Sequence, residues 1–504
     1  MKKQKKTARI LLLLLAFCMV SVSCSVKEEK NNPVQADKET TPAEETAAET
    51  EYVGDKRRIY PDSLPDEDLG GYGYRICTST GNMHFFCADE LTGEVLNDSI
   101  FQRNSAVEKR YNTDLQFIDF GLENYYYMPE LVEPFIMAGD DFADLFEVHC
   151  VTGANLSLKG VLRNLYELEY VDFTQPWWFP QSVEEMTYMG KMFLGNSAIS
   201  YEGLASVSVH YVNLDMWNAY GLYEKWESIY NLVEENHWTL DKLVTVTKGI
   251  YQDVDGNGVR DQKDEYGFII TPEPEGYLYA FDAPILQKDE DGLKVVAKND
   301  KVVSIVETMY DFMYNQESTL VVPTFTDGKE TDTAAMLAEG HALTVVGAIS
   351  RATEEALRET ETDYGIIPLP KYSEEQKNFR CFATGEYMAV PITHVESRIT
   401  GLVFEALNAE GYRQIIPTYE EIALKQKYLR DEESGKMFDL ILDSYTTSFT
   451  FNYDNWEGFA MLFGKLFNVN GGTKDVVSYL ERNMKVAERR ARKVTEGFIN
   501  YNQG

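Results

Sequence analysis

The residues whose types and spacing most clearly suit ligand chemistry lie in one segment, 253–264. Its sequence, DVDGNGVRDQKD, has the oxygen-bearing side chains and the central glycine of a calcium-binding loop. Calcium prefers oxygen ligands, and Gly258 falls where such a loop turns sharply. In loop order, the candidate metal ligands are Asp253, Asp255, Asn257, Val259 through its carbonyl, Asp261 and Asp264.

A second interpretation of this segment is a turn that binds nothing, because Asp-Gly and Asn-Gly pairs are common in loops. Side-chain oxygens in register at five loop positions favour calcium. Asp264 stands where a glutamate usually contacts the ion, which resembles the calcium loops of dockerin modules. A single loop between a helix and a strand would stabilise the fold rather than act as a switch. We therefore predict structural Ca²⁺.

The chain has no recognisable catalytic motif. We find no G-x-S-x-G, no H-E-x-x-H, and no phosphate-binding or dinucleotide-binding loop. The six histidines are scattered, and none pairs with another at metal-ligand spacing. Carboxylates are so numerous that no pair of them can be singled out as an acid and base. The sequence therefore predicts a protein that is not an enzyme and has no catalytic residues.

The N-terminal segment has the features of a secretory signal. A basic start precedes an apolar run over 10–20, which is too short for a stable membrane span. We predict a signal peptide over 1–23 and lipid (palmitate) attachment at Cys24, on the extracellular face of the cell membrane. Ser21 stands where lipoprotein signals usually have leucine, and an ordinary signal peptide is the alternative. Residues 24–56 are acidic and poor in apolar side chains, which predicts a disordered tether.

Charge and cysteine content narrow the class of protein further. The formal net charge of −35 opposes nucleic-acid binding, which depends on lysine and arginine, so we expect no nucleic-acid partner. After the signal and Cys24, four cysteines remain, at positions 77, 87, 150 and 381, with no C-x-x-C pair. A Cys77–Cys87 disulfide and four free thiols are both open interpretations.

Apolar runs alternate with helical patterns along the chain. This alternation predicts an α/β fold with mostly parallel sheets, in two sets, followed by a mainly helical C-terminal region. Strands are predicted over 72–77, 115–120, 144–148, 206–212, 266–270, 342–347, 364–368 and 387–391, and helices over 98–111, 128–138, 239–251 and 476–501.

Several segments, in their order along the chain, resemble the extracellular solute-binding protein family 1. This is the maltodextrin-binding-like group of ABC importer lipoproteins, and the resemblance is to its Firmicutes branch. It covers roughly residues 70 to 500, and its segments include GEVLNDSIFQRN at 93–104, DLFEV at 144–148, PWW at 176–178, VNLDMW at 212–217, WTLDKL at 238–243 and YGIIPLP at 364–370.

The resemblance implies a periplasmic-binding-protein-like fold of two discontinuous α/β lobes around a ligand cleft. The first lobe would comprise 57–197 and 366–410, and the second 198–365 and 411–504. Such a protein captures a carbohydrate, here an oligosaccharide, by lobe closure, and delivers it to an ABC importer permease as a monomer. The alternatives are a binder of peptide or another polar solute, and a secreted carbohydrate-active enzyme.

Ligands of open α/β sheets lie at the carboxyl ends of strands, which locates the candidate binding residues. Polar side chains there can bind sugar hydroxyls, and aromatic rings can stack on a sugar. Four tryptophans, at positions 177, 178, 217 and 238, are expected to pack in the core instead. The predicted ligand-binding residues are Thr78, Ser79, Thr80, His149, Ser350, Tyr387 and Trp456.

Overall fold

The first sheet consists of three strands from the N-terminal part of the fold and one strand from much later in the chain. The computed structural model describes residues 55–326, 328–425, 432–454 and 458–501. The strand order is β15-β3-β1-β2; β1 is parallel to β2 and β3, and β15 is antiparallel to β3. Its strands are β1 (Tyr72–Thr78), β2 (Thr113–Asp119), β3 (Leu145–His149) and β15 (Glu386–Ala389).

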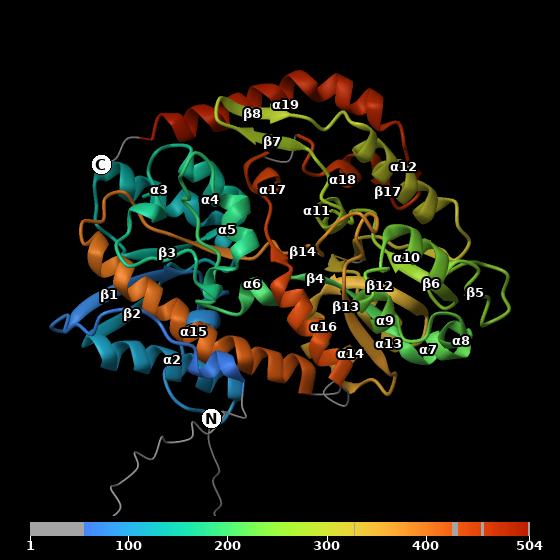
Figure 1. Ribbon diagram of the computed structural model, residues 1–504, viewed down its shortest axis with the longest axis horizontal. Helices are drawn as coiled ribbons and strands as arrows, with labels where there is room; N and C mark the ends of the chain where they lie inside the picture. The colour runs from blue at the N-terminus through green and yellow to red at the C-terminus, as the bar shows by residue number, and fades with distance from the viewer. Residues whose placement is uncertain (1–54, 327, 426–431, 455–457, 502–504) are drawn as a thin grey trace, which may run out of the picture. The chain divides into compact units, whose positions relative to one another are not determined.

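Helices pack against this sheet through their apolar faces. Helix α15 (Ser397–Lys425) lies beside α2 (Val95–Tyr111), as Figure 1 shows. A Cβ atom on Gly411 of α15 would overlap the carbonyl oxygen of Ala198, so glycine allows this close approach. The other helices near this sheet are α1 (Met83–Phe86), α3 (Met128–Ala138), α4 (Cys150–Ser157) and α5 (Pro180–Met186).

The second sheet is mixed rather than mostly parallel. Its order is β13-β4-β12-β6-β5, with β9 also paired to β6. Strand β4 is antiparallel to both β12 and β13. Mostly parallel pairing was predicted, but a pattern of alternating strands and helices does not fix strand direction. The strands are β4 (Ser208–Asn213), β5 (Tyr251–Gln252), β6 (Glu265–Ile270), β9 (Thr319–Val321), β12 (Ala342–Ala348) and β13 (Tyr364–Pro368).

The predicted lobe boundaries need correction at two places. Residues 366–368 were expected in the first lobe, but they lie in β13, which pairs with β4 of the second sheet. The chain returns to the first sheet only at β15. The segment 411–504 was expected in the second lobe, yet α17 (Phe449–Asp454) contacts α4 beside the first sheet. Gly54–Gly504 forms one compact unit that contains both sheets.

The last hundred or so residues are mainly helical, as predicted, and further helices surround the second sheet. The predicted helix 239–251 ends at Thr247, because Gly249 has a φ of 80° and the chain then enters β5. The helices around the second sheet include α6 (Glu202–Ala205), α7 (Leu214–Ala219), α8 (Leu222–Trp226), α9 (Ile229–Glu234), α10 (Leu240–Thr247), α11 (Gly276–Ala280), α12 (Asp300–Tyr314), α13 (Thr333–Ala338) and α14 (Glu355–Glu359).

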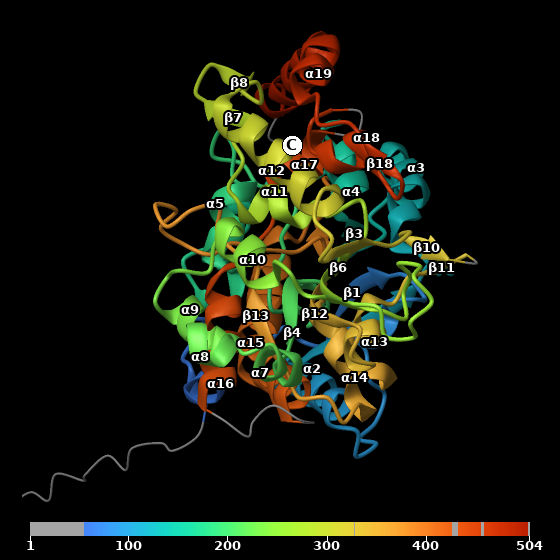
Figure 2. The same ribbon diagram turned by 90° about the vertical axis from the view of Figure 1, so that its right-hand side faces the viewer.

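The C-terminal helices complete the fold. Helix α19 (Val476–Ile499) lies along the hairpin of β7 (Leu286–Asp289) and β8 (Gly292–Val295), as Figure 2 shows. Among the described residues, no helix is both long and apolar enough to cross a membrane. The predicted signal peptide, Cys24 and most of the tether lie outside the described residues. The remaining C-terminal helices are α16 (Glu432–Asp443) and α18 (Leu462–Leu466).

Short elements connect these layers. The 3₁₀ helices are η1 (Lys56–Ile59), η2 (Tyr125–Tyr127), η3 (Leu165–Glu167), η4 (Pro176–Trp178) and η5 (Ile349–Thr353). The short strands are β10 (Phe325–Thr326), β11 (Lys329–Glu330), β14 (Cys381–Phe382), β16 (Tyr445–Thr446), β17 (Phe467–Asn468) and β18 (Gly471–Gly472).

The structure decides one question that the sequence left open and confirms one prediction. All four cysteines in the described part of the chain are free, so Cys77 and Cys87 form no disulfide. The four tryptophans expected in the core are all buried, as predicted. Trp177 and Trp178 each donate an indole N–H hydrogen bond of 2.9 Å to the buried carboxylate of Glu405.

Candidate functional site

A buried glutamate on β3 lies where the first sheet ends. Glu147 is a charged residue type in a mostly apolar strand, and it is fully buried. Its Oε2 accepts hydrogen bonds from the backbone N–H of Ser79 at 2.9 Å and from the Ser79 hydroxyl at 3.1 Å. Its Oε1 accepts a short hydrogen bond from the Asn82 amide. The groups that follow β1 therefore converge on this carboxylate.

Two segments that connect the sheets bring further carboxylates to the same place. Glu386 begins β15, opposite His149 at the end of β3, and is 3% exposed. One of its carboxylate oxygens accepts a short hydrogen bond from Ser200. Its backbone N–H donates to Oε2 of Glu202 at 2.6 Å. The other carboxylate oxygen, Oε2, is buried and has no hydrogen-bond donor.

We define Glu147, Glu202 and Glu386 as the carboxylate cluster. Burial and repulsion raise the pKa of two of its members, Glu147 and Glu386. Burial raises the pKa of Glu147 to about 7, against the opposing hydrogen bonds from Ser79 and Asn82. Burial also raises the pKa of Glu386 well above its usual range. The nearby charge of Glu202, a side-chain hydrogen bond with Glu202 and the charge of Glu147 raise it further. The cluster therefore holds at least one proton near neutral pH.

Aromatic rings lie beside the cluster. The ring centroids of Tyr125 and Tyr126 lie 5.5 Å and 5.1 Å from that of His149. His149 caps helix α4, because its Nδ1 accepts a hydrogen bond of 3.3 Å from the backbone N–H of Val151. Burial lowers the pKa of His149 to about 4, so this ring is neutral at physiological pH.

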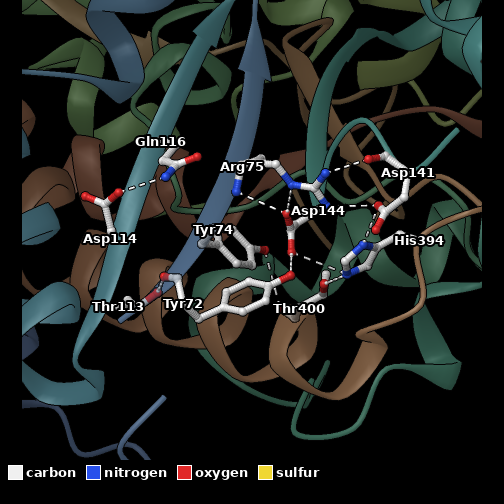
Figure 3. Close-up of polar contacts among 10 residues, drawn as sticks. All are labelled: Tyr72, Tyr74, Arg75, Thr113, Asp114, Gln116, Asp141, Asp144, His394 and Thr400. Atoms are coloured by element: carbon white, nitrogen blue, oxygen red, sulfur yellow. Dashed lines mark hydrogen bonds and ion pairs between the residues drawn. The ribbon is translucent and has the colours of Figure 1, made fainter. Parts of the chain in front are cut away.

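A second buried carboxylate on the same sheet is held very differently. Asp144, just before β3, is fully buried and accepts hydrogen bonds from Nε of Arg75 at 2.8 Å and from the Tyr72 hydroxyl at 2.5 Å. His394 also lies 3.4 Å from Asp144, and Asp141 pairs with both Arg75 and His394. Figure 3 shows that these groups point toward one another. These contacts hold the loop before β3, and the two aspartates are paired with Arg75 and His394.

The structure brings together some of the predicted ligand-binding residues and separates others. Ser79 contacts the carboxylate cluster and His149 lies beside it, whereas Thr80 bonds to Asp119 at 2.8 Å on the exposed side. Thr78 is fully buried. Tyr387 is fully buried and accepts a hydrogen bond from Asn452 at 3.0 Å, so its ring packs in the core instead of being exposed to stack on a ligand.

The remaining predicted residues lie elsewhere. Ser350 is in η5, where its carbonyl accepts a hydrogen bond of 2.7 Å from Thr353. Trp456 lies outside the described residues. The sequence analysis missed Glu147, Glu202 and Glu386. For two of them the signal was a lone glutamate in an apolar strand, in DLFEV and in GEYMAV.

The predicted calcium loop joins β5 to β6. The carboxylates of Asp253, Asp255 and Asp264 converge, with one oxygen of each within 4.8 Å of the others. Gly258 has a φ of 71°, as the predicted sharp turn requires, and Asp264 is fully buried. Asp261 accepts a hydrogen bond of 2.9 Å from the backbone N–H of Lys263, and Asn257 accepts one of 2.5 Å from the backbone N–H of Val259. Three convergent carboxylates are a donor set that fits Ca²⁺.

None of the three glutamates of the carboxylate cluster lines a polar cavity of about 860 Å³. Helix α5 supplies Glu185, α12 supplies Lys301, and the segment before β14 supplies Tyr372 and Arg380. Its volume is in the range of small-molecule sites. Arg380 already pairs with Glu185 across it at 2.6 Å.

No family model and no curated protein matches this chain. Its mixed helices and two sheets nevertheless define a periplasmic-binding-protein-like fold, which solved structures share. The sugar-binding protein MalE from Xanthomonas citri is similar with a TM-score of 0.55 and 12% identity, covering 86% of this chain and 100% of that one.

Two further solved structures show the same fold. UgpB from Mycobacterium tuberculosis, in complex with glycerophosphocholine, has a TM-score of 0.52 and 15% identity over 84% of this chain and 99% of that chain. The galacto-N-biose-/lacto-N-biose I-binding protein of the ABC transporter from Bifidobacterium longum has a TM-score of 0.52 and 12% identity, over 86% and 98%.

Proposed function

We propose that this chain is a solute-binding protein of an ABC importer and that its ligand is a carbohydrate, namely an oligosaccharide. The observation that carries the proposal is the meeting of carboxylates and rings at the carboxyl ends of β1 and β3 in this fold. Ligands of open α/β sheets bind at such ends. Carboxylates accept hydrogen bonds from sugar hydroxyls, and rings such as Tyr125 can pack on a sugar face. The names of two similar structures, a sugar-binding protein and an ABC transporter's binding protein, support this assignment.

Binding would act by favouring a closed conformation. Glu147 and Glu386 belong to the first sheet, whereas Glu202 lies in α6, on the segment that leads from the first sheet to β4 of the second. A ligand that contacts both sets binds one arrangement of the connecting segments better than others, and this differential affinity shifts the conformational equilibrium. No bond needs to be made or broken, so the proposal requires no catalytic residue.

The proposal includes extracellular attachment and delivery. Cys24 would carry the lipid, and residues 24–56 would form the tether after removal of 1–23. An anchored monomer has a high effective concentration beside its permease, which favours delivery. The sequence resemblance to the Firmicutes branch of the solute-binding family supports this part. Metabolic labelling with a clickable palmitate analogue would test it, with Cys24→Ser as the variant expected to lose the label.

Calcium is the proposed structural ion. Asp253, Asp255 and Asp264 would hold it through carboxylates, together with Asn257, Asp261 and the Val259 carbonyl. When bound, the ion would neutralise three crowded negative charges and fix the loop between β5 and β6. The convergence of the three carboxylates and the positive φ of Gly258 support this assignment.

A thermal-shift screen tests the ligand class, because binding to the folded state alone raises the melting temperature. Maltotriose, lacto-N-biose, glycerophosphocholine and a tripeptide mixture would be compared on the mature protein. Stabilisation by a sugar is the expected result, and stabilisation by peptides alone would overturn the carbohydrate assignment. Variants Glu386→Gln and Arg380→Ala separate the two candidate locations, since only the first should change sugar affinity if the ligand sits at the strand ends. A release of reducing sugar during incubation would instead identify an enzyme.

A further inference from the structure

The carboxylate cluster lacks a positive partner. In the described part of the chain, no lysine or arginine forms an ion pair with Glu147, Glu202 or Glu386, whose strongest charged neighbours are one another. Asp144, on the same sheet, has Arg75 and His394 beside it (Figure 3). This fold therefore neutralises one buried carboxylate group with basic side chains and leaves the other, at the strand ends, with protons alone.

Resting on the proposed function, we infer that the ligand carries a protonated amine, as in an amino sugar, and that this cation binds the carboxylate cluster. Glu386 supplies the decisive atom: it is 3% exposed, and its Oε2 is buried without a donor. An ammonium group has three N–H donors and can bond to this oxygen and to Glu202 together. A buried charge is costly unless it is paired, so the cluster favours a ligand of opposite charge.

The groups around the cluster suit a cation. Tyr125 and Tyr126 present rings beside His149, and aromatic faces attract cations. His149 is neutral near pH 7, so it does not repel an ammonium group. A hydroxyl could donate one hydrogen bond to Oε2 but would leave the negative charges uncompensated. The titratable groups that face Glu386 are Tyr125, Glu147, Tyr201, Glu202 and Tyr445.

Matched sugars that differ only in the substituent at C2 of each ring test this inference on the mature protein. The probes are chitobiose, N,N′-diacetylchitobiose and cellobiose, together with glucosamine, N-acetylglucosamine and glucose, and the non-sugar amine spermidine. In isothermal titration calorimetry we expect at least about tenfold tighter binding of an amine than of its acetylated or hydroxyl counterpart.

The outcomes separate the inference from the proposed function. Equal or tighter binding of a neutral sugar overturns the cationic ligand and keeps the carbohydrate assignment. Binding of spermidine without any sugar supports the cation and overturns the carbohydrate. No binding by any probe in these sets or in the thermal-shift screen overturns both.

Variants and proton release provide a second test. Glu386→Gln keeps the size of the side chain and should abolish the tenfold amine preference, while Glu405→Gln, a buried carboxylate outside the cluster, should retain it. Because the ligand-free cluster holds protons, amine binding should release protons, so its affinity should rise from pH 5.5 to pH 7.5. Calorimetry in two buffers of different ionisation enthalpy measures the release. An amine affinity that is independent of pH and unchanged in Glu386→Gln would refute the assignment.

Discussion

Replacing Asp253 with alanine tests the calcium loop most directly, because two opposing effects nearly cancel when no metal is bound. The variant loses the hydrogen bonds that Asp253 accepts from Gly256 and Gly258, both at 2.8 Å. Each such bond contributes about 0.5–1.5 kcal/mol. The variant also relieves repulsion with Asp255 and Asp264, whose oxygens lie within 4.8 Å. At that separation each pair of charges repels by about 0.9 kcal/mol in a medium like water.

The free energy of unfolding in EDTA should therefore differ by no more than about 1 kcal/mol between Asp253→Ala and the parent protein. With calcium at one hundred times its dissociation constant, the parent should gain about 2.7 kcal/mol, and the variant should gain almost none. The folded unit Gly54–Gly504 has about 450 residues, so this gain corresponds to a rise of about 3 °C in melting temperature.

Differential scanning calorimetry in EDTA and in calcium chloride is the appropriate assay. Asp291→Ala is the matched control, because Asp291 is an exposed aspartate in the turn between β7 and β8, outside the loop. It should show the same calcium-dependent rise as the parent. Identical melting of the parent with and without millimolar calcium would refute the metal assignment. A rise that persists in Asp253→Ala would show that calcium binds elsewhere.

Three further predictions follow from the buried groups. Glu405→Ala leaves the indole N–H groups of Trp177 and Trp178 without acceptors, so urea denaturation should show a loss of about 2–6 kcal/mol. His149→Ala removes the cap of α4 and should lower stability by about 0.5–2 kcal/mol as well as weakening sugar binding in calorimetry. The pKa values of Glu147 (about 7) and Glu405 (about 8) are raised on folding, so their stabilising contribution is complete below about pH 4.5 and is lost as pH rises toward 8. Melting temperatures of the ligand-free protein from pH 5 to pH 8.5 should fall accordingly, and a rise across this range would contradict the assignment.

Much of the first sheet is predictable from local sequence. The strand predicted over 72–77 is observed as Tyr72–Thr78, and that over 144–148 as Leu145–His149, because buried parallel strands appear as short apolar runs. The direction of β4 is not predictable in this way. It depends on where the chain enters the second sheet, which is a property of the whole topology rather than of residues 208–213.

Only part of the candidate site could be predicted from the sequence, for the same reason. Reasoning from strand ends located Ser79 and His149, which do lie at the site. It could not locate Glu386, which is distant along the chain and meets His149 only through the pairing of β15 with β3. Tyr387, chosen for its ring, is the next residue along β15, and successive strand side chains point to opposite faces. The predicted residue therefore has its ring in the core, and the carboxylate at the candidate site belongs to the residue one position before it.

The segments around Glu386 also indicate where bending between the sheets is restricted. Buried Arg103 donates hydrogen bonds to the carbonyls of Ile199 and Phe86, which fixes the first connecting segment to the first-sheet side. Just beyond it, a Cβ atom on Gly385 would lie 2.9 Å from the Cα atom of Gly203, so the two connecting segments touch there. The closure that the proposed function requires would therefore leave this contact, next to Glu202 and Glu386, in place. A ligand that binds these carboxylates, as proposed, would therefore act beside the contact between the two connecting segments.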